Sequence, residues 1–196
     1  MGMKRAQEMA ERIGGWLTLN EGRFLYKLAR NCAGAGVIVE IGSWMGRSTT
    51  WLGCGSKEGQ SVPIYAVDPH EGGDEHHWAG PQKTLSLFAE NMRAAQLDGI
   101  VHALVMTSRQ AADLIDQPVT LLFIDGDHRY DYVRLDFDLW SPRLVKGGCI
   151  VLHDAWGATA LPGPHRIVEE CICPNLDFDQ ISTVDSIVAA RRRTAP

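Results

Sequence analysis

Residues 37–50 read VIVEIGSWMGRSTT, and this stretch is the most informative one about the fold. Its opening run, Val37–Ile41, is apolar apart from one acid and lacks the alternation of a half-exposed strand, which indicates a strand covered on both faces. Two glycines, Gly42 and Gly46, follow it, and glycine lets the backbone turn tightly and come close to a ligand. We therefore expect a buried strand that ends in a ligand-binding turn.

Further apolar runs predict further strands of the same kind. They lie at Ile64–Asp68, Val101–Met106, Thr120–Asp125 and Cys149–His153. Between them, apolar residues recur at helical spacing from Leu85 to Ala95 and from Val133 to Leu144. The alternation of strands with helices predicts an α/β domain whose sheet is doubly wound and mostly parallel.

The two ends of the chain complete the predicted sheet. Before the first strand, TLNEGRFLYKLAR predicts a helix with Thr18 or Asn20 as its N-cap. After the last parallel strand, PGPHRIVEECIC predicts a helix, and FDQISTVDSIVAAR predicts two strands broken at Asp185 and Ser186. The expected fold is Rossmann-like, with a sheet of about seven strands that ends in a hairpin.

Length and composition fit one soluble domain. The 196 residues are 45% hydrophobic, enough for one core, so we expect a single domain over 1–196 with an N-terminal helical segment over 1–36. The net charge of -5 argues against nucleic acid as a partner, because phosphate binding needs a basic face. Five cysteines without a metal-ligand spacing predict reduced, mostly structural thiols. The lack of a long apolar run or a signal-like start predicts a cytoplasmic location without membrane contact.

The glycine turn favours one class of nucleoside cofactor over another. It reads GSWMG over 42–46 and lacks the G-x-G-x-x-G pattern of nicotinamide-binding proteins. The pattern E-x-G-x-x-x-G-x-S, from Glu40 to Ser48, resembles the first motif of S-adenosylmethionine-dependent methyltransferases, with Trp44 in place of the middle glycine of many members. The next strand ends in Asp68, whose carboxylate can accept hydrogen bonds from both hydroxyls of a ribose.

This resemblance implies S-adenosylmethionine as the cofactor and a set of residues that contact it. Ser108 and Arg109 follow the third strand, where such enzymes usually contact the adenine, although a helix N-cap at Thr107 or Ser108 explains the same residues. The implied cofactor-binding residues are Glu40, Gly42, Ser43, Gly46, Ser48, Asp68, Ser108, Arg109 and Asp125.

Acidic and histidine side chains follow the fourth and fifth predicted strands. Asp125, Asp127 and His128 come after one strand, and His153 and Asp154 come after the next. Neighbouring parallel strands bring such residues to one edge of the sheet, where several acids need a cation or a proton to compensate them. Carboxylate oxygens suit Mg²⁺, and an imidazole shifts the preference toward Mn²⁺ or another transition ion. In the alternative interpretation, Asp127 caps a turn and His153 is hydrogen-bonded in its strand.

The motifs around these residues resemble those of metal-dependent sugar and macrolide O-methyltransferases and of the related cephalosporin hydroxylase proteins. The motifs read I-D-G-D-H-x-Y and P-x-L-x-x-G-G-x-x-x-x-H-D. The resemblance implies Asp125, His153 and Asp154 as ligands of a divalent cation, with His153 in place of an acid that is common in these relatives. It also implies catalytic roles for Asp125 and for His128, which stands at the position of the base.

The expected function follows from the chemistry of methyl transfer. A sulfonium methyl group is already activated, so the enzyme has to hold an acceptor oxygen in line with it and remove the proton of that oxygen. A metal lowers the pKa of acceptor hydroxyls, and a histidine titrates near neutrality. We expect a metal-assisted O-methyltransferase for a small hydroxylated molecule of the sugar or natural-product type. The alternatives are a hydroxylase-like reaction on the same fold and a non-catalytic binder.

Two further features bear on partners. The segment PHEGGDEHHWAGPQ at 69–82 carries His70, His76, His77 and Trp78, and we expect it to cover the acceptor as a polar loop, although its histidines also leave a metal site open. The N-terminal helix and the terminal hairpin offer surfaces for a homodimer.

Overall fold

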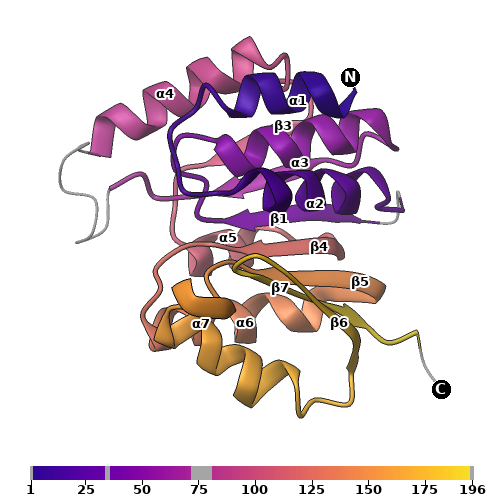
Figure 1. Ribbon diagram of the computed structural model, residues 1–196. Helices are drawn as coiled ribbons and strands as arrows, with labels where there is room; N and C mark the ends of the chain where they lie inside the picture. Colours follow the sequence, from indigo (N-terminus) through magenta and orange to yellow (C-terminus); the bar gives the residue numbers. More distant parts are fainter. Residues whose placement is uncertain (1, 34–35, 72–80, 195–196) are drawn as a thin grey trace.

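The computed structural model describes residues 2–33, 36–71 and 81–194. It contains a seven-stranded sheet in the order β3-β2-β1-β4-β5-β7-β6 (Figure 1). The strands are β1 (Val37–Ile41), β2 (Ile64–Val67), β3 (Val101–Leu104), β4 (Val119–Ile124), β5 (Leu144–Leu152), β6 (Phe178–Val184) and β7 (Ile187–Arg192). Strands β1 to β5 pair in parallel, whereas β7 pairs antiparallel with both β5 and β6. The predicted doubly wound, mostly parallel sheet with a terminal hairpin is confirmed.

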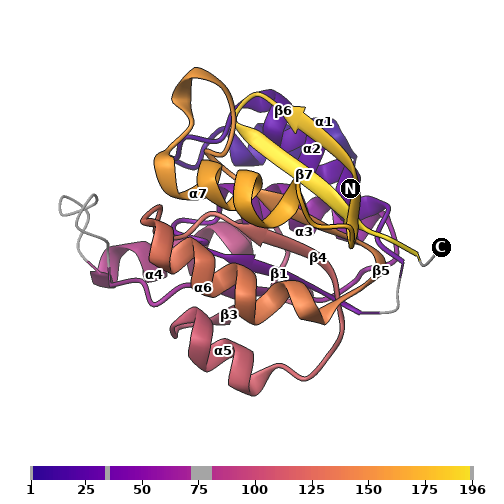
Figure 2. The same cartoon turned by 90° about the horizontal axis from the view of Figure 1, so that it is seen from below.

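Helices cover both faces of this sheet. They are α1 (Met3–Ala10), α2 (Leu19–Arg30), α3 (Arg47–Glu58), α4 (Pro81–Ala94), α5 (Ser108–Leu114), α6 (Tyr130–Trp140) and α7 (Pro162–Ile167). Helices α1 to α4 share one hydrophobic core with one face of the sheet, and α5 to α7 share a second core with the other face. Figure 2 shows α5 and α6 on the opposite side of the sheet from α1 and α2. None of the helices within the described ranges combines the length and apolar composition that crossing a bilayer requires.

The two cores explain why the strand sequences do not alternate. In β1, Ile38 belongs to the core beneath α1 to α4, and its neighbour Val39 belongs to the core beneath α5 to α7. In β4, Leu121 and Leu122 are divided between the two cores in the same way. Because successive side chains of a strand point to opposite faces, a strand covered on both faces is apolar at nearly every position, and Glu40 is the exception in β1.

Capping boxes define the starts of two helices. At α2, Thr18 Oγ1 accepts a hydrogen bond from the backbone N–H of Glu21 (3.2 Å), and the Glu21 carboxylate accepts one from the N–H of Thr18 (2.8 Å). Thr107 and Gln110 form the same arrangement at α5. Thr18 is therefore the cap of α2 in preference to Asn20, and Thr107 is the cap at the start of α5.

One predicted helix is too long. The spacing of apolar residues predicts a helix that reaches Leu144, but α6 ends at Trp140, a short 3₁₀ turn spans Ser141–Arg143, and Leu144 begins β5. The reason is Pro142, which has no N–H to continue the helix and restricts the backbone of the residue before it. Leu144 is buried, as predicted, but as part of the sheet.

The ends of three parallel strands set the position of the candidate site. Strands β2, β4 and β5 end one residue earlier than predicted, so that Asp68, Asp125 and His153 each come directly after a strand. Strand pairing places the ends of β1, β2, β4 and β5 level with one another. These three side chains therefore start from the same edge of the sheet, where ligands of parallel α/β folds bind.

Candidate active site

The glycine turn between β1 and α3 needs its two glycines for conformation and for space. Gly42 (φ +85) and Gly46 (φ +89) both have left-handed backbones, which residues with a Cβ rarely adopt. A Cβ on Gly42 would collide with the backbone carbonyl of Asp125, and a Cβ on Gly46 would lie 2.6 Å from the Met92 side chain. The turn is thus packed directly against the end of β4, where the acidic residues begin.

Trp44 occupies the position at which many methyltransferase turns have a further glycine, and its backbone is left-handed as well (φ +44). Its N–H donates a hydrogen bond to Asp68 Oδ2 (2.7 Å). Its indole stacks on Trp16, with ring centroids 5.1 Å apart. The strained backbone is therefore held by a carboxylate on one side and an aromatic ring on the other.

Glu40 lies beneath the turn. Its side chain is fully buried, and its two oxygens accept hydrogen bonds from Ser48 Oγ (2.6 Å) and Thr49 Oγ1 (2.5 Å) in the first turn of α3. Burial raises the pKa of Glu40 to about 8, although these two hydroxyl donors act in the opposite direction. Glu40 and Ser48 thus support the turn from below, since both are buried and bonded to each other. The cofactor contacts expected of both residues stay predictions.

Asp68 lies beside the turn, as predicted, and ties it to β2. Its Oδ2 accepts hydrogen bonds from the backbone N–H of Ser43 (3.0 Å) and Trp44 (2.7 Å), and its Oδ1 accepts one from the N–H of His70 (2.7 Å). A carboxylate has about four acceptor sites, so little capacity is left for a ribose in this arrangement. The ribose contact of Asp68 stays a prediction.

Ser108 and Arg109 lie in the first turn of α5, below the Thr107 cap. Ser108 Oγ accepts a hydrogen bond from Nε1 of Trp140 (2.9 Å), whose indole is fully buried. Arg109 is exposed. The expected contacts of both residues with an adenine stay predictions.

In the segment at 69–82, the structure describes a buried histidine, His70. His70 is 4% exposed, and its Nδ1 lies 3.3 Å from Thr84 Oγ1, with its ring against Phe88. Burial lowers the pKa of His70, and Asp68 opposes that effect. His70 is thus part of the packing below α4, and the expected cover of an acceptor by this segment stays a prediction. His76, His77 and Trp78 lie outside the described residues.

The residues after β4 and β5 converge, as predicted. Ligand atoms of Asp125, His128 and Asp154 all lie within 4.8 Å of one another. His128 Nε2 lies 3.8 Å from Asp125 Oδ1 and 3.3 Å from Asp154 Oδ2. The side chains are partly accessible, with exposed fractions of 19% for His128 and 22% for each acid. Two oxygens and one nitrogen in this arrangement suit a divalent cation.

His153 lies below this group and is almost fully enclosed, with 5% of its side chain exposed. Its Nδ1 lies 3.1 Å from both Asp125 Oδ1 and Asp154 Oδ2, and its Nε2 lies 3.4 Å from Glu21 Oε2. A buried nitrogen aimed between two carboxylates fits the ligand role predicted for His153.

The four groups neutralise one another electrostatically. Burial alone would lower the pKa of both imidazoles, but the facing carboxylates outweigh it and raise the pKa of His128 to about 10 and that of His153 to about 12. The imidazoles in turn lower the pKa of Asp125 and Asp154, against the effect of burial. Protons thus provide the positive charge that a bound cation would otherwise supply, and metal binding would displace them.

Asp127, the other acid of the I-D-G-D-H motif, does not join this cluster. Its Oδ1 accepts a hydrogen bond from the N–H of Arg129 (2.9 Å), and its carboxylate pairs with the Arg129 guanidinium. The interpretation of Asp127 as a turn cap is therefore confirmed, and the acid is available as a control for Asp125.

Sequence reasoning missed Glu21, which reaches the cluster from α2. The one available signal was the T-x-x-E spacing of a capping box, which explains Glu21 without any role at the site. Glu21 stands 132 positions before His153, so only the folded chain brings the two together.

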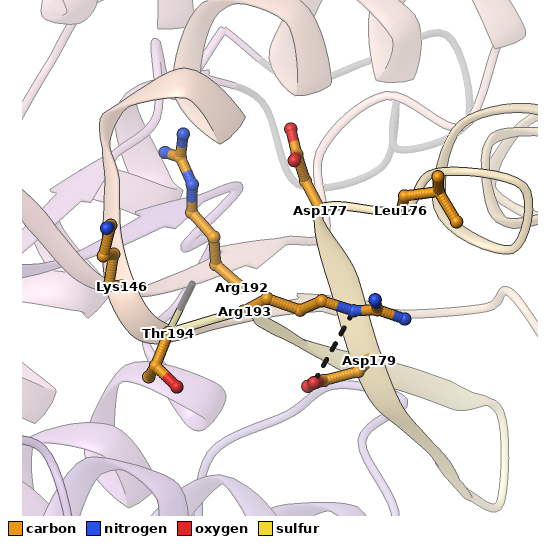
Figure 3. A pocket seen from close by; sticks show the side chains of 7 residues that line it. All are labelled: Lys146, Leu176, Asp177, Asp179, Arg192, Arg193 and Thr194. Atoms are coloured by element: carbon orange, nitrogen blue, oxygen red, sulfur yellow. Dashed lines mark ion pairs between the residues drawn. The ribbon is translucent and has the colours of Figure 1, made fainter. Parts of the chain in front are cut away.

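A separate hollow lies at the outer strands (Figure 3). It measures about 600 Å³ and is lined by Lys146, Leu176, Asp177, Asp179, Arg192, Arg193 and Thr194. Arg193 Nε pairs with Asp179 Oδ2 at 3.7 Å, and Arg192 donates hydrogen bonds to the carbonyls of Pro142 (2.8 Å) and Leu144 (2.7 Å). Arg192 thus attaches the terminal hairpin to the start of β5, and Arg193 pairs with β6. None of the predicted site residues lines the hollow.

The cysteines take no part in the candidate site. Cys32, Cys54, Cys149 and Cys171 are buried, Cys173 is exposed, and all are free. Burial raises the pKa of the Cys149 thiol to about 12. Inert, buried thiols of this kind agree with the structural role predicted for them.

The sheet order, the antiparallel hairpin and the glycine turn together define the fold of the class I S-adenosylmethionine-dependent methyltransferases. A family model described as a methyltransferase domain matches residues 39–155, and the chain belongs to this family. The match extends from β1 to just beyond Asp154 and includes both the glycine turn and the acidic cluster.

Solved structures of methyltransferases share this fold. The O-methyltransferase from Bacillus cereus, in complex with SAH, superposes with a TM-score of 0.68 and is 18% identical, over 98% of this chain and 92% of that one. The O-methyltransferase TomG from Streptomyces achromogenes, involved in tomaymycin synthesis and solved in complex with SAM, gives a TM-score of 0.67 at 15% identity, over 97% and 88% of the two chains. At this identity the likeness concerns the fold alone.

Relatives by sequence match in part. The uncharacterized protein R132 of Acanthamoeba polyphaga mimivirus is 37% identical over 62 residues, or 30% of this chain. The uncharacterized protein y4gI of Sinorhizobium fredii is 29% identical over 119 residues, or 60% of this chain. The matches span 28% and 13% of the length of these two relatives.

Proposed function

We propose that this protein is an S-adenosylmethionine-dependent O-methyltransferase that uses a divalent cation to bind a small hydroxylated acceptor. The observation that carries the proposal is the convergence of Asp125, His128, His153 and Asp154 at the edge of the sheet, in contact with a glycine turn of the methyltransferase type. An acceptor bound at the acids would lie next to a cofactor bound at the turn.

The turn supports the cofactor assignment through a polar atom that the fold leaves unused. Ser43 Oγ is buried and makes no hydrogen bond to any of the described residues. In the proposal, Ser43 and the backbone of Gly42 and Gly46 hold the methionine part of the cofactor, Asp68 holds its ribose, and Ser108 with Arg109 faces its adenine. The two related structures solved with SAM or SAH support this choice of ligand.

The acids support the cation assignment. Asp125 and Asp154 would provide oxygen ligands and His153 its Nδ1, since these atoms already face a common point. A bound Mg²⁺ or Mn²⁺ supplies Lewis acidity, which lowers the pKa of an acceptor hydroxyl and orients it. His128 is the partly exposed group next to both acids. Once a bound cation has displaced its proton, His128 would accept the proton of that hydroxyl.

The first experiment is a calorimetric titration of S-adenosylmethionine and S-adenosylhomocysteine into chelator-treated protein, repeated with NAD and after addition of Mg²⁺ or Mn²⁺. The proposal expects binding of both sulfur nucleosides, no binding of NAD, and metal binding that the substitution Asp125→Ala removes. A screen of sugars and diols for methyl transfer would then define the acceptor. Failure of both sulfur nucleosides to bind would overturn the proposal.

A further inference from the structure

Glu21 carries a carboxylate that is buried more completely than a helix cap requires. Its side chain is 1% exposed. Besides the Thr18 N–H, Glu21 accepts hydrogen bonds from the N–H (2.9 Å) and the Oγ (2.7 Å) of Ser186, in the turn between β6 and β7. Its other oxygen faces His153 Nε2 at 3.4 Å. A solvent-exposed capping box needs none of these contacts.

The contact with Glu21 orients the His153 ring. A carboxylate that accepts the hydrogen of Nε2 leaves Nδ1 as the nitrogen that faces Asp125 and Asp154, each 3.1 Å away. Once the proton on Nδ1 is displaced, that nitrogen presents a lone pair to the space between the acids. Metal-binding histidines are commonly held in this way, by a carboxylate on the nitrogen that does not bind the metal.

A second path leads from Glu21 to Asp154. Ser186 Oγ, which donates its hydrogen to Glu21, accepts a hydrogen bond from the backbone N–H of Asp154 (3.3 Å). Asp154 needs this support because its backbone is left-handed, with φ +50. Glu21, which lies in α2, therefore supports two of the three expected metal ligands. It contacts His153 directly and Asp154 through Ser186 of the terminal hairpin.

We propose that Glu21 is a positioning residue for the divalent cation: it holds His153 with Nδ1 toward the metal and, through Ser186, fixes the backbone that carries Asp154. This inference rests on the metal-assisted form of the proposed function. A purely structural role in capping α2 is the competing explanation, and it predicts that removal of the cap would have the same effect as removal of the carboxylate.

The test measures Mn²⁺ binding by electron paramagnetic resonance of the chelator-treated protein, with detection of the imidazole nitrogen coupled to bound Mn²⁺. In Glu21→Gln, the amide N–H₂ can donate to Nε2, which turns the protonated nitrogen of a neutral His153 toward the metal. We expect an affinity loss of about 10- to 100-fold, with a weaker nitrogen signal. Glu21→Asp, which keeps the charge, should retain more affinity than Glu21→Gln.

The control is Thr18→Ala, which removes the hydroxyl that caps α2 and donates to Asp185 Oδ2 (2.6 Å), but leaves the contacts of Glu21 with His153 and Ser186. It should lower the melting temperature and leave Mn²⁺ affinity unchanged. Ser186→Ala, which breaks the second path, provides a second test if Glu21→Gln does not fold, and it should weaken Mn²⁺ binding more than Thr18→Ala does.

Two results would overturn the inference about Glu21 but leave the proposed function standing. One is a folded Glu21→Gln protein that binds Mn²⁺ with wild-type affinity. The other is an equal loss of Mn²⁺ affinity in Ser186→Ala and Thr18→Ala. Absence of Mn²⁺ binding to the wild-type protein would overturn both this inference and the metal-assisted part of the proposed function.

Discussion

The glycine turn and the acidic cluster meet at Gly42, which packs on the backbone of Asp125, and they differ in which groups compensate their carboxylates. In the turn, Glu40 bonds two hydroxyls and Asp68 bonds three backbone N–H groups. In the cluster, two carboxylates and two imidazoles face one another, and His153 Nδ1 lies 3.1 Å from both acids.

This difference separates residues that we expect to act mainly on stability from residues that we expect to act mainly on function. The bonds of Glu40 and Ser48 hold the first turn of α3, so both residues stabilise the fold. In the cluster, the protons of two imidazoles compensate two acids at a partly buried edge, and a bound cation can replace those protons. Substitutions in the cluster should therefore change function most, and substitutions beneath the turn should change mainly stability.

The largest effect is expected from His128→Gln. Loss of a general base lowers kcat by about 10²- to 10⁴-fold, while the affinity for S-adenosylhomocysteine should stay the same because the turn is untouched. Steady-state methyl transfer and calorimetry measure the two quantities. A variant with normal kcat would show that another group removes the proton.

Asp125→Asn follows, with Asp127→Asn as its control in the same motif. Loss of one charge that positions the cation and the acceptor should lower kcat by about 10²- to 10³-fold and weaken Mn²⁺ binding. Asp127 is exposed and paired with Arg129, so its variant should keep both properties. Equal losses in the two variants would contradict the distinction between the clustered acid and the turn cap.

Acid should destabilise the metal-free protein through Glu21. Its pKa is lowered from 4.5 to about 2: burial alone would raise it, but His153 and Ser186 outweigh that effect. A carboxyl with a lowered folded-state pKa stabilises the protein above its unfolded pKa and loses that contribution as pH falls, here from about pH 5 to about pH 2. The loss amounts to about 3 kcal/mol of unfolding free energy.

Urea unfolding at a series of pH values measures this loss. The substitution Glu21→Gln should flatten the dependence of the unfolding free energy on pH. A wild-type curve parallel to that of the variant would contradict the assignment.

The smallest effect is expected beneath the turn, from Ser48→Ala. Removal of one hydrogen bond to Glu40 should cost about 1 kcal/mol of unfolding free energy. The affinity for S-adenosylhomocysteine should change little, because Ser48 supports the turn from below. A large loss of affinity for S-adenosylhomocysteine at unchanged stability would instead support the direct contact of Ser48 with the cofactor that the sequence predicts.

Sequence patterns predicted the elements well where one local cause dominates. The apolar runs mark strands buried on both faces, and Asp185 with Ser186 marks the hairpin turn. The prediction for Leu144 was wrong because helical spacing continues in the sequence beyond Pro142, which stops the helix. The packing of His70 against Phe88 was not predicted, because no local pattern shows that contact.

By itself, the sequence determined the class of fold, the two glycines of the turn and the set of acids and histidines after two strands, because each of these depends on local periodicity or on the backbone of single residues. Only the tertiary structure decided that Glu40 lies beneath the turn, that Asp127 stands apart from Asp125, and that Glu21 braces His153. Ser48 contacts Glu40 across 8 positions of the chain, and His153 contacts Glu21 across 132 positions. The packing of α3 and α2 on the sheet sets these contacts, and the local sequence pattern does not show how the helices pack.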